Sequence, residues 1–244
     1  MRKFGLIGKN ISYSFSESYF QNKFDKEHIK DTSYQNFDLD SISEFKFLIK
    51  NNPEIAGLNV TIPYKEEVIP YLELINKTAK EIGAINTIKI TKKRKLKGYN
   101  TDYYGFKKSL EPLLTKQHKK ALILGTGGAS KAVAYALKKL NIRYSYVSRT
   151  KNEDNFTYKE LNEKIIKDHL VIINCSPVGT YPHVKDCPNL PYQFITDQHV
   201  LFDLIYNPNE TLFLKKGKQQ GASICNGLRM LELQAEKSWE IWNK

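Results

Sequence analysis

Strand-like and helix-like patterns alternate along the first hundred residues. After the first strand, Ser16 is a candidate cap for a helix whose apolar positions Tyr19, Phe20 and Phe24 recur at helical period. The segment Ser41–Glu44 has the spacing of a capping box and precedes a second helical pattern. This alternation predicts a mostly parallel sheet with functional groups at the carboxyl ends of its strands. The predicted strands are Phe4–Ile7, Tyr34–Leu39, Ile55–Ile62 and Ala84–Ile90.

A second alternating series begins near residue 120. The apolar run Lys120–Gly125 is typical of a buried strand, and a glycine turn leads from it into a helical pattern. The strand Tyr144–Ser148 follows, and two more apolar strands, His169–Cys175 and Val200–Tyr206, each end at breaking residues. The chain is therefore predicted to form two α/β domains, linked by the helix Tyr103–Leu114 and the polar residues after it.

Composition and charge change this picture little. The 244 residues are 41% hydrophobic and 26% charged, values typical of a globular protein. The net charge of +12 invites a nucleic-acid-binding interpretation, but lysines are spread along the whole chain. The densest group, Lys92–Lys95, lies between the short runs Thr87–Ile90 and Leu96–Tyr99, where it indicates an exposed hairpin turn. We therefore expect no nucleic-acid partner, and the same field would serve an anionic small molecule.

Two further classes of protein are disfavoured. No run approaches the roughly 18 apolar residues of a membrane span, and the N-terminal apolar stretch is interrupted by Gly5 and Gly8. We therefore expect no membrane association and a cytoplasmic location. The three cysteines, Cys175, Cys187 and Cys225, are scattered without paired spacing, which argues against a disulfide framework or a metal site.

The stretch LILGTGGASKAV has the strand–turn–helix context of a phosphate cradle. Gly125 allows a sharp turn, Gly127 allows the backbone to approach a pyrophosphate, and the helix that follows offers N–H donors. Ser130, at the third position of the G-x-G-x-x-G spacing, is small enough for close helix–strand packing. The alternative is a glycine turn without a ligand. The context favours a Rossmann-type dinucleotide-binding domain.

The end of the next strand bears on the choice of dinucleotide. An NAD site would present an acidic residue there to the ribose 2′-hydroxyl. The segment Ser148–Lys151 contains none, and the first acid after it is Glu153. Arg149 suits a 2′-phosphate, because its planar guanidinium donates paired charge-assisted hydrogen bonds. The pattern favours NADP, and the alternative is a solvated strand end.

Lys65 is the candidate for acid–base chemistry. A nucleotide domain joined to a smaller α/β domain suggests hydride transfer in a cleft between them, and ketone reduction also needs a proton donor. Pro63 places Lys65 near a helix start, where the macrodipole disfavours an ammonium by about 0.3–1 kcal/mol. Glu66 and Glu67 offset that cost. The alternative is a surface lysine in an acidic first turn.

Other polar residues are predicted at the same edge of the sheet. Asn86 and Asp102 each follow a strand, and Ser14 and Ser16 follow the first strand. Any one of them could be a cap or a turn residue. Because all of them stand at strand ends, as Lys65 does, together they indicate one site.

These stretches, in this order, resemble the shikimate dehydrogenase family almost from end to end. The matching motifs are the Ser-x-Ser of SYSFS, then NVTIPYK, GAINT, NTDYYGF, GTGGASKA, SRT, NCSPVG and GLRMLELQAEKSWEIW. The resemblance implies a reversible, NADPH-dependent reduction of 3-dehydroshikimate to shikimate in chorismate and aromatic amino-acid biosynthesis.

Site roles are carried over residue by residue from this resemblance. It makes Lys65 and Asp102 the catalytic pair, with Asp102 orienting the lysine ammonium. The implied substrate-binding residues are Ser14, Ser16, Thr61, Asn86, Tyr206 and Gln234. The implied cofactor-binding residues are Gly125, Thr126, Gly127, Gly128, Ala129, Ser130, Ser148, Arg149, Thr150, Lys151, Leu204 and Gly227. The family's second basic residue after SRT has no clear counterpart: Asp154 stands near its place, and Lys151 is the candidate substitute.

The expected architecture is an N-terminal substrate domain with a mostly parallel sheet, a Rossmann-type NADP-binding domain, and a cleft between them. The substrate domain would comprise residues 1–103 plus about 227–244, and the NADP-binding domain residues 104–226. The expected partners are the small-molecule substrate and NADP, and the oligomeric state is left open between monomer and homodimer. Two alternatives stay open: an NAD-using quinate/shikimate dehydrogenase, and a non-catalytic nucleotide-binding regulatory protein.

Overall fold

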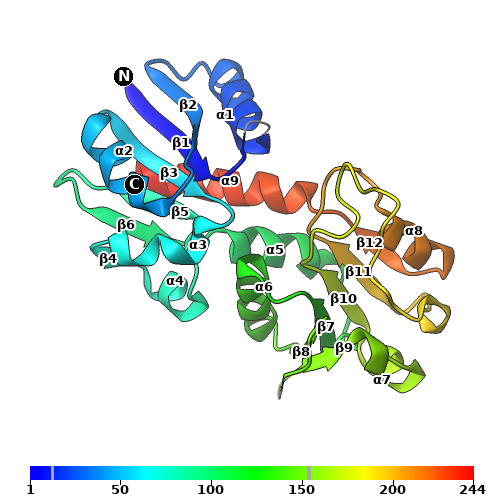
Figure 1. The fold of residues 1–244 in the computed structure, drawn as a ribbon. Coiled ribbons are helices and arrows are strands. Elements are labelled where there is room, and N and C mark those ends of the chain that lie inside the picture. Colours follow the sequence, from blue (N-terminus) through cyan, green and yellow to red (C-terminus); the bar gives the residue numbers. More distant parts are fainter. Residues whose placement is uncertain (12–13, 153–154) are drawn as a thin grey trace. The chain divides into compact units, whose positions relative to one another are not determined.

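The computed structural model describes residues 1–11, 14–152 and 155–244. Internal contacts divide the chain into two compact units (Figure 1). Unit 1 comprises Met1–Thr101 and Gln234–Lys244, and unit 2 comprises Asp102–Leu233. Each unit holds one six-stranded sheet with helices beside it. The predicted fold class, two α/β domains with parallel-rich sheets, is therefore confirmed.

A mixed sheet organises unit 1. Its strands are β1 (Arg2–Gly8), β2 (Thr32–Asp38), β3 (Ile55–Val60), β4 (Leu74–Ile75), β5 (Thr87–Ile90) and β6 (Leu96–Tyr99). Its α-helices are α1 (Phe15–Lys26), α2 (Phe45–Asn51), α3 (Tyr64–Glu67) and α4 (Lys77–Ile82), with short 3-10 helices η1 (Ile42–Glu44) and η2 (Ile69–Tyr71). The strand order is β2-β1-β3-β5-β6-β4. Parallel pairing joins β1 to β2 and β3, and β4 to β6, whereas β5 runs antiparallel to β3 and β6, which confirms the predicted hairpin.

The core of unit 1 follows from the alternation of side chains along β1. Phe4 and Leu6 face one side of the sheet, where they pack with α1 and with the last turns of the C-terminal helix α9 (Leu228–Asn243). Ile7 faces the other side and packs with residues of α2, α3 and α4. Gly57 of β3 allows Trp242 of α9 to dock, since a Cβ there would lie 2.3 Å from the indole nitrogen. The Trp242 indole N–H then donates to the Ile88 carbonyl at 2.9 Å.

A wholly parallel sheet organises unit 2, in the order β12-β11-β10-β7-β8-β9. Its strands are β7 (Lys120–Leu124), β8 (Arg143–Ser148), β9 (Asn155–Thr157), β10 (Val171–Asn174), β11 (Val200–Asp203) and β12 (Ser223–Cys225). Its α-helices are α5 (Asp102–Leu110), α6 (Gly128–Lys139), α7 (Glu163–Asp168) and α8 (Leu212–Gln219), with 3-10 helices η3 (Glu111–Leu113), η4 (Tyr158–Glu160) and η5 (Tyr192–Phe194).

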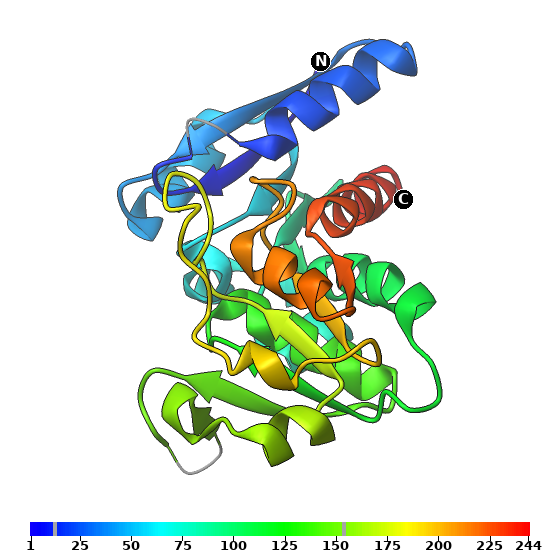
Figure 2. The same ribbon diagram turned by 90° about the vertical axis from the view of Figure 1, so that its right-hand side faces the viewer.

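Helices cover both faces of the sheet in unit 2. Ile123 and Ile173 belong to a core cluster that includes residues of α5 and α6. Leu122 and Ile172, one position earlier in the same strands, belong to a cluster with residues of α7 and α8. Figure 2 views the sheet of unit 2 from the side on which α7 and α8 lie. Because both faces are buried, these strands read as continuous apolar runs. None of the helices in the described ranges combines the length and the hydrophobicity of a membrane span.

The division of the chain lies close to the predicted domain boundaries but differs at both. The first boundary falls between Thr101 and Asp102, because α5 belongs to unit 2 from its first residue. The second falls between Leu233 and Gln234 inside α9. Met230 packs into a core cluster of unit 2, which explains why the start of α9 is assigned there.

Candidate active site

Lys65 lies in a single helical turn just after the carboxyl end of β3. The Thr61 carbonyl accepts a hydrogen bond from the Tyr64 N–H at 3.0 Å. The buried Tyr64 anchors the turn, because its hydroxyl donates to the Leu39 carbonyl at 2.6 Å. The Lys65 carbonyl accepts from the Ile85 N–H at 2.7 Å, which ties the turn to the segment that leads into β5. The backbone of the half-buried Lys65 is thus held on two sides.

The prediction that Lys65 stands at a helix start is confirmed, but the helix is short. α3 comprises only Tyr64–Glu67, with Pro63 at its cap. The macrodipole sums over aligned peptide units, so one turn gives little of the electrostatic cost that the sequence argument assigned to Lys65. The turn provides a fixed backbone direction instead.

Asn86 stands at the centre of a buried hydrogen-bond network in unit 1. Its Oδ1 accepts from the Thr101 N–H at 2.6 Å and from the Thr87 hydroxyl at 3.0 Å. Its Nδ2 donates to the Thr101 hydroxyl at 2.9 Å and to Gln234 Oε1 at 3.3 Å. Asn86 is 3% exposed and Gln234 is 6% exposed. Two predicted substrate-binding residues, 148 positions apart in the chain, are thus in direct contact.

The network continues through residues that the sequence argument did not single out. Ser238, four positions after Gln234 on α9, is fully buried. Its Oγ lies 2.8 Å from the Thr87 hydroxyl and 3.1 Å from the Thr101 hydroxyl. It also accepts from Asn59 Nδ2 at 3.1 Å. A signal was present, because residues four apart share one helix face and Asn59 belongs to the NVTIPYK motif.

Ser14, and not Ser16, caps α1. Ser14 has an extended backbone, and its Oγ accepts from the Glu17 N–H at 3.3 Å. The prediction that Ser16 caps this helix is wrong, because the helix already begins at Phe15 and Ser16 lies in its first turn. The Ser14 hydroxyl donates to Asn36 Oδ1 at 2.7 Å, so its proton already has an acceptor.

Asp102 is the first residue of α5 and is 6% exposed. It follows Thr101 directly, so the hydrogen bond from the Thr101 N–H to Asn86 holds the backbone from which α5 starts. Asp102 is assigned to unit 2 and Lys65 to unit 1. Their role as a catalytic pair stays a prediction.

The glycine turn in unit 2 has the geometry of a phosphate cradle. Gly125 has a φ of 101°, in the left-handed region that favours glycine, and its N–H donates to the Val147 carbonyl at 2.9 Å. A Cβ built on Gly127 would meet nothing within 4 Å, so the backbone there faces open space. α6 begins at Gly128, and no side chain in the described ranges caps its first turn. The Ser130 hydroxyl donates to the Gly127 carbonyl at 2.7 Å.

These features fit the diphosphate of a dinucleotide. An uncapped helix start offers N–H donors to an anion, and an approachable glycine backbone lets that anion come close. Of the remaining predicted residues of this turn, Thr126 is exposed and Ala129 is half-buried. The shape and the donor chemistry of this turn therefore fit a cofactor diphosphate, and the binding role of its residues stays a prediction.

The end of β8 is held by Asn155 of β9. Its Nδ2 donates to the Thr150 carbonyl at 3.0 Å and also to the Ser148 hydroxyl. Arg149 is exposed, and its charge acts on Tyr158 of η4. Burial raises the pKa of Tyr158, and the nearby guanidinium opposes that rise. The charge of Arg149 at this strand end is therefore felt at η4.

The Lys151 ammonium is hydrogen-bonded to other groups of the protein. Its ammonium donates to Glu160 Oε1 at 2.8 Å, to Glu160 Oε2 at 3.1 Å and to the Asn155 carbonyl at 2.8 Å. Glu153 and Asp154, which entered the argument about the dinucleotide, lie outside the described residues. Lys151 thus stands at the predicted strand end with its donors already bonded.

Asp203, at the end of β11, carries a fully buried carboxyl group that was not predicted from the sequence. Asp203 Oδ1 accepts from the Ile205 N–H at 3.0 Å and from Asn174 Nδ2 at 3.1 Å, and Oδ2 accepts from the Thr211 hydroxyl at 2.6 Å. Burial raises the pKa of Asp203 to about 6, although these hydrogen bonds oppose the rise. Asp203 joins the ends of β10 and β11 to the start of α8, directly before the predicted cofactor residue Leu204.

Leu204 and Gly227 are brought together. A Cβ on Gly227 would lie 2.1 Å from the Leu204 carbonyl oxygen, so only glycine fits there. The Gly227 N–H donates to the Ile205 carbonyl at 3.0 Å. Tyr206, the predicted substrate-side tyrosine, belongs to the same loop of unit 2 and is 37% exposed.

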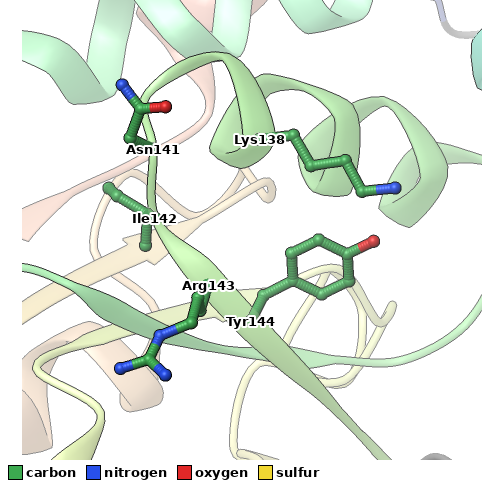
Figure 3. A pocket seen from close by; sticks show the side chains of 5 residues that line it. All are labelled: Lys138, Asn141, Ile142, Arg143 and Tyr144. Carbon is green, nitrogen blue, oxygen red and sulfur yellow. The ribbon is translucent and has the colours of Figure 1, made fainter.

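An open surface pocket of about 600 Å³ lies elsewhere in unit 2 (Figure 3). Its lining residues are Lys138, Asn141, Ile142, Arg143 and Tyr144. They lie at the end of α6, in the connection that follows it and at the start of β8, whereas the glycine turn and Ser148–Lys151 lie at the opposite ends of these elements. None of the predicted site residues lines this pocket, so it is not part of the candidate site.

The fold and the glycine turn define a class: a two-unit α/β protein whose second unit is a Rossmann-type sheet. Residues 6–88 match the family described as the shikimate dehydrogenase substrate binding domain. The chain is 41% identical over 250 residues to the NADP(+) shikimate dehydrogenase of Clostridium botulinum, a match that covers 98% of this chain and 95% of the relative.

Solved structures agree with this match. A crystal structure of shikimate dehydrogenase from Aquifex aeolicus superposes with a TM-score of 0.88 at 36% identity, covering 100% of this chain and 92% of the other. The Thermus thermophilus enzyme, in complex with NADP(H) and shikimate, superposes with a TM-score of 0.87 at 26% identity, covering 99% and 93%. The chain therefore belongs to the shikimate dehydrogenase family, as the sequence motifs predicted. The roles of individual residues are not tested by these similarities and stay predictions.

Proposed function

We propose that this chain is an NADP-dependent shikimate dehydrogenase. It would catalyse the reversible reduction of 3-dehydroshikimate to shikimate in chorismate and aromatic amino-acid biosynthesis. The observation that carries the proposal is the similarity, over nearly the full length, to an NADP(+) shikimate dehydrogenase. The glycine turn and the buried contact between Asn86 and Gln234 support it, since they supply an anion cradle and fixed polar groups.

Unit 2 would bind the cofactor, and NADP when bound supplies or accepts the hydride. The N–H groups at the start of α6 and the backbone of Gly125–Ser130 would bind its diphosphate. Arg149, with Ser148 and Thr150 beside it, would bind the ribose 2′-phosphate, because a guanidinium forms strong paired hydrogen bonds with phosphate. Leu204 and Gly227 are the proposed contacts of the nicotinamide.

Unit 1 would bind the substrate. The hydroxyls of Ser14 and Ser16 are proposed donors to the shikimate carboxylate, for which Ser14 would exchange its present acceptor, Asn36 Oδ1. Thr61, Asn86 and Gln234 are proposed partners of the ring hydroxyls. Asn86 and Gln234 are already fixed by the buried network, so binding would not have to order them. Tyr206 of unit 2 is a further proposed substrate contact.

Lys65 would transfer the proton. In the direction of reduction, its ammonium would give a proton to the former keto oxygen as that oxygen becomes an alkoxide. In the direction of oxidation, the neutral amine would take the proton back. Asp102 would orient the amine. The anchored turn that carries Lys65 supports this assignment, because proton transfer depends on a fixed donor position.

A spectrophotometric assay tests the proposal. Shikimate with NADP⁺ should give absorbance of the reduced cofactor, and shikimate with NAD⁺ should give a lower kcat/KM. Arg149→Ala should raise the KM for NADP⁺ by about ten-fold or more, because a hydrogen bond to a charged group contributes about 1.5–3 kcal/mol. NAD⁺ kinetics should change by less than about two-fold with this variant. Equal losses with both cofactors would mean that Arg149 supports structure.

The same assay separates the alternatives. Faster turnover with quinate and NAD⁺ would identify an NAD-using quinate/shikimate dehydrogenase, and cofactor binding without turnover would identify a regulatory protein. The cytoplasmic location, the lack of a nucleic-acid partner and the choice between monomer and homodimer stay predictions.

A further inference from the structure

The ammonium of Lys151 has an acceptor for each of its donors. An ammonium carries three N–H groups. Three acceptors lie within hydrogen-bond distance of Lys151 Nζ: the Asn155 carbonyl at 2.8 Å, Glu160 Oε1 at 2.8 Å and Glu160 Oε2 at 3.1 Å. A contact between Lys151 and a phosphate would therefore displace at least one of them.

The carboxylate of Glu160 is held independently of Lys151. The Thr157 N–H donates to Glu160 Oε2 at 2.6 Å and the Thr157 hydroxyl donates to it at 2.9 Å, as the capping box of η4. The hydrogen bond from Lys151, followed by those from Thr157, lowers the pKa of Glu160 to about 2, so Glu160 is ionised at neutral pH. The position of the carboxylate is therefore set by the start of η4, and Lys151 reaches it there.

The same short helix lies beside Arg149. The guanidinium of Arg149 acts on Tyr158, the first residue of η4, and Glu160 is the last residue of that helix. Lys151 thus contacts η4 directly, the charge of Arg149 acts on the same short helix, and Glu160 is the acidic residue of η4. One cation of the proposed 2′-phosphate site is neutralised by it.

We propose that Glu160 limits the preference of this chain for NADP over NAD by withholding Lys151 from the 2′-phosphate. This inference rests on the proposed function. Arg149 would then bind the phosphate without help from Lys151. NAD lacks the 2′-phosphate, so its binding is insensitive to both groups. Glu160 is thus a specificity-determining residue, and Lys151 is its partner rather than a ligand of the cofactor.

Glu160→Gln tests the proposal without disturbing the local fold. Glutamine also serves at the third position of a capping box, so the variant keeps the Thr157 contacts and loses the charge. Fluorescence titration should show NADPH bound about three- to ten-fold more tightly, and NADH changed by less than about two-fold. The gain in NADPH affinity should shrink in ~0.5 M salt, because salt screens the charge of the released Lys151 ammonium.

A second measurement tests the ribose phosphate without the nicotinamide. Adenosine 2′,5′-bisphosphate carries the ribose phosphate without the nicotinamide, so calorimetry with this probe should show the same gain with Glu160→Gln. Lys151→Ala alone should change NADPH affinity by less than about two-fold, and in the double variant the gain from Glu160→Gln should be smaller. The matched control is Glu163→Gln, which breaks the exposed pair between Glu163 and Lys167 at 2.6 Å on α7. Glu163→Gln should change neither the affinity for NADPH nor the affinity for adenosine 2′,5′-bisphosphate.

Three results would overturn the proposal. If Lys151→Ala weakened NADPH binding by about five-fold or more, or if Glu160→Gln weakened it, Lys151 would already bind the phosphate, with Glu160 orienting it. If Glu160→Gln tightened NADPH and NADH equally, the effect would not concern the 2′-phosphate. If the unaltered chain bound neither cofactor, the proposed function would fail together with this inference, whereas the first two results leave that function standing.

Discussion

Replacing Ser238 by alanine should destabilise unit 1 by about 2 kcal/mol. The hydroxyl is fully buried, and it is bonded to Thr87 at 2.8 Å, Thr101 at 3.1 Å and Asn59 Nδ2 at 3.1 Å. It also donates to the carbonyl of Gln234 at 2.9 Å. Alanine keeps the packing of the Cβ and removes all four contacts.

The expected cost is smaller than the sum of four hydrogen bonds, because the partners have alternatives. The hydroxyls of Thr87 and Thr101 can each donate to Asn86 Oδ1, at 3.0 and 3.2 Å, and Asn59 Nδ2 retains the Asn86 carbonyl at 3.2 Å. What remains is the net loss of about one or two buried hydrogen bonds, at about 0.5–1.5 kcal/mol each. The total is therefore about 1–3 kcal/mol.

The assay can report unit 1 selectively. The chain has two tryptophans, Trp239 and Trp242, and both belong to the part of α9 assigned to unit 1. Urea unfolding followed by tryptophan fluorescence therefore measures this unit. Ser33→Ala is the matched control, because the buried Ser33 Oγ has no hydrogen-bond partner among the described residues. Its removal should be neutral or stabilising, since an unpaired buried hydroxyl is unfavourable.

The predicted cost is refuted if the free energy of unfolding of Ser238→Ala lies within about 0.5 kcal/mol of that of the unaltered chain, because a hydroxyl with four buried contacts should contribute more. The assigned role of its hydrogen bonds is refuted equally if Ser33→Ala costs as much as Ser238→Ala, because the effect would then come from losing any buried hydroxyl. The KM for shikimate gives a second readout. It should rise with Ser238→Ala and stay unchanged with Ser33→Ala, since only Ser238 contacts the network around Gln234.

Two further predictions concern the proposed chemistry and the buried carboxyl group. Lys65→Ala should lower kcat by about 10²–10⁴-fold and leave KM within several-fold, because proton transfer acts in the transition state; a variant that keeps more than half of the turnover would exclude this role. Burial raises the pKa of Asp203 from 3.8 to about 6, so this group contributes stability that is present below about pH 4 and is lost as the pH rises through 6. Asp203→Asn should remove that loss, about 2–3 kcal/mol between pH 4 and 7.5, in urea unfolding followed by circular dichroism. An unchanged pH dependence would mean that Asp203 does not titrate in this range.

Features with a local cause could be predicted from the sequence. The capping box at Ser41–Glu44 is present. Gly83 ends α4 with a φ of 74°, in the left-handed region that favours glycine at a helix C-terminus. The glycine turn follows a buried strand and opens a helix, and the hairpin β5–β6 forms where the charged turn predicted it. Each of these depends on residues close together in the chain, so the sequence contains the signal.

Features with a distant cause could not be predicted. The contact between Asn86 and Gln234 spans 148 positions, and no periodicity connects them. The carboxyl group of Asp203 is informative only once β10, β11 and the start of α8 surround it. Lys65 shows an intermediate case. The sequence placed it at a helix start, but the contacts that hold its turn come from Leu39, just after β2, and from Ile85, just before β5.

The buried network also determines which way its amides point. The donor from Thr101 to Asn86 is a backbone N–H, which cannot act as an acceptor, so the atom of Asn86 at 2.6 Å from it must be Oδ1. Nδ2 of Asn86 must therefore face Gln234, and it needs an acceptor there, which is Oε1 at 3.3 Å. An amide that accepts with Oε1 on one side turns its Nε2 to the other. Under the proposed function, Gln234 would thus meet the substrate as a donor, and a ring hydroxyl would accept from it.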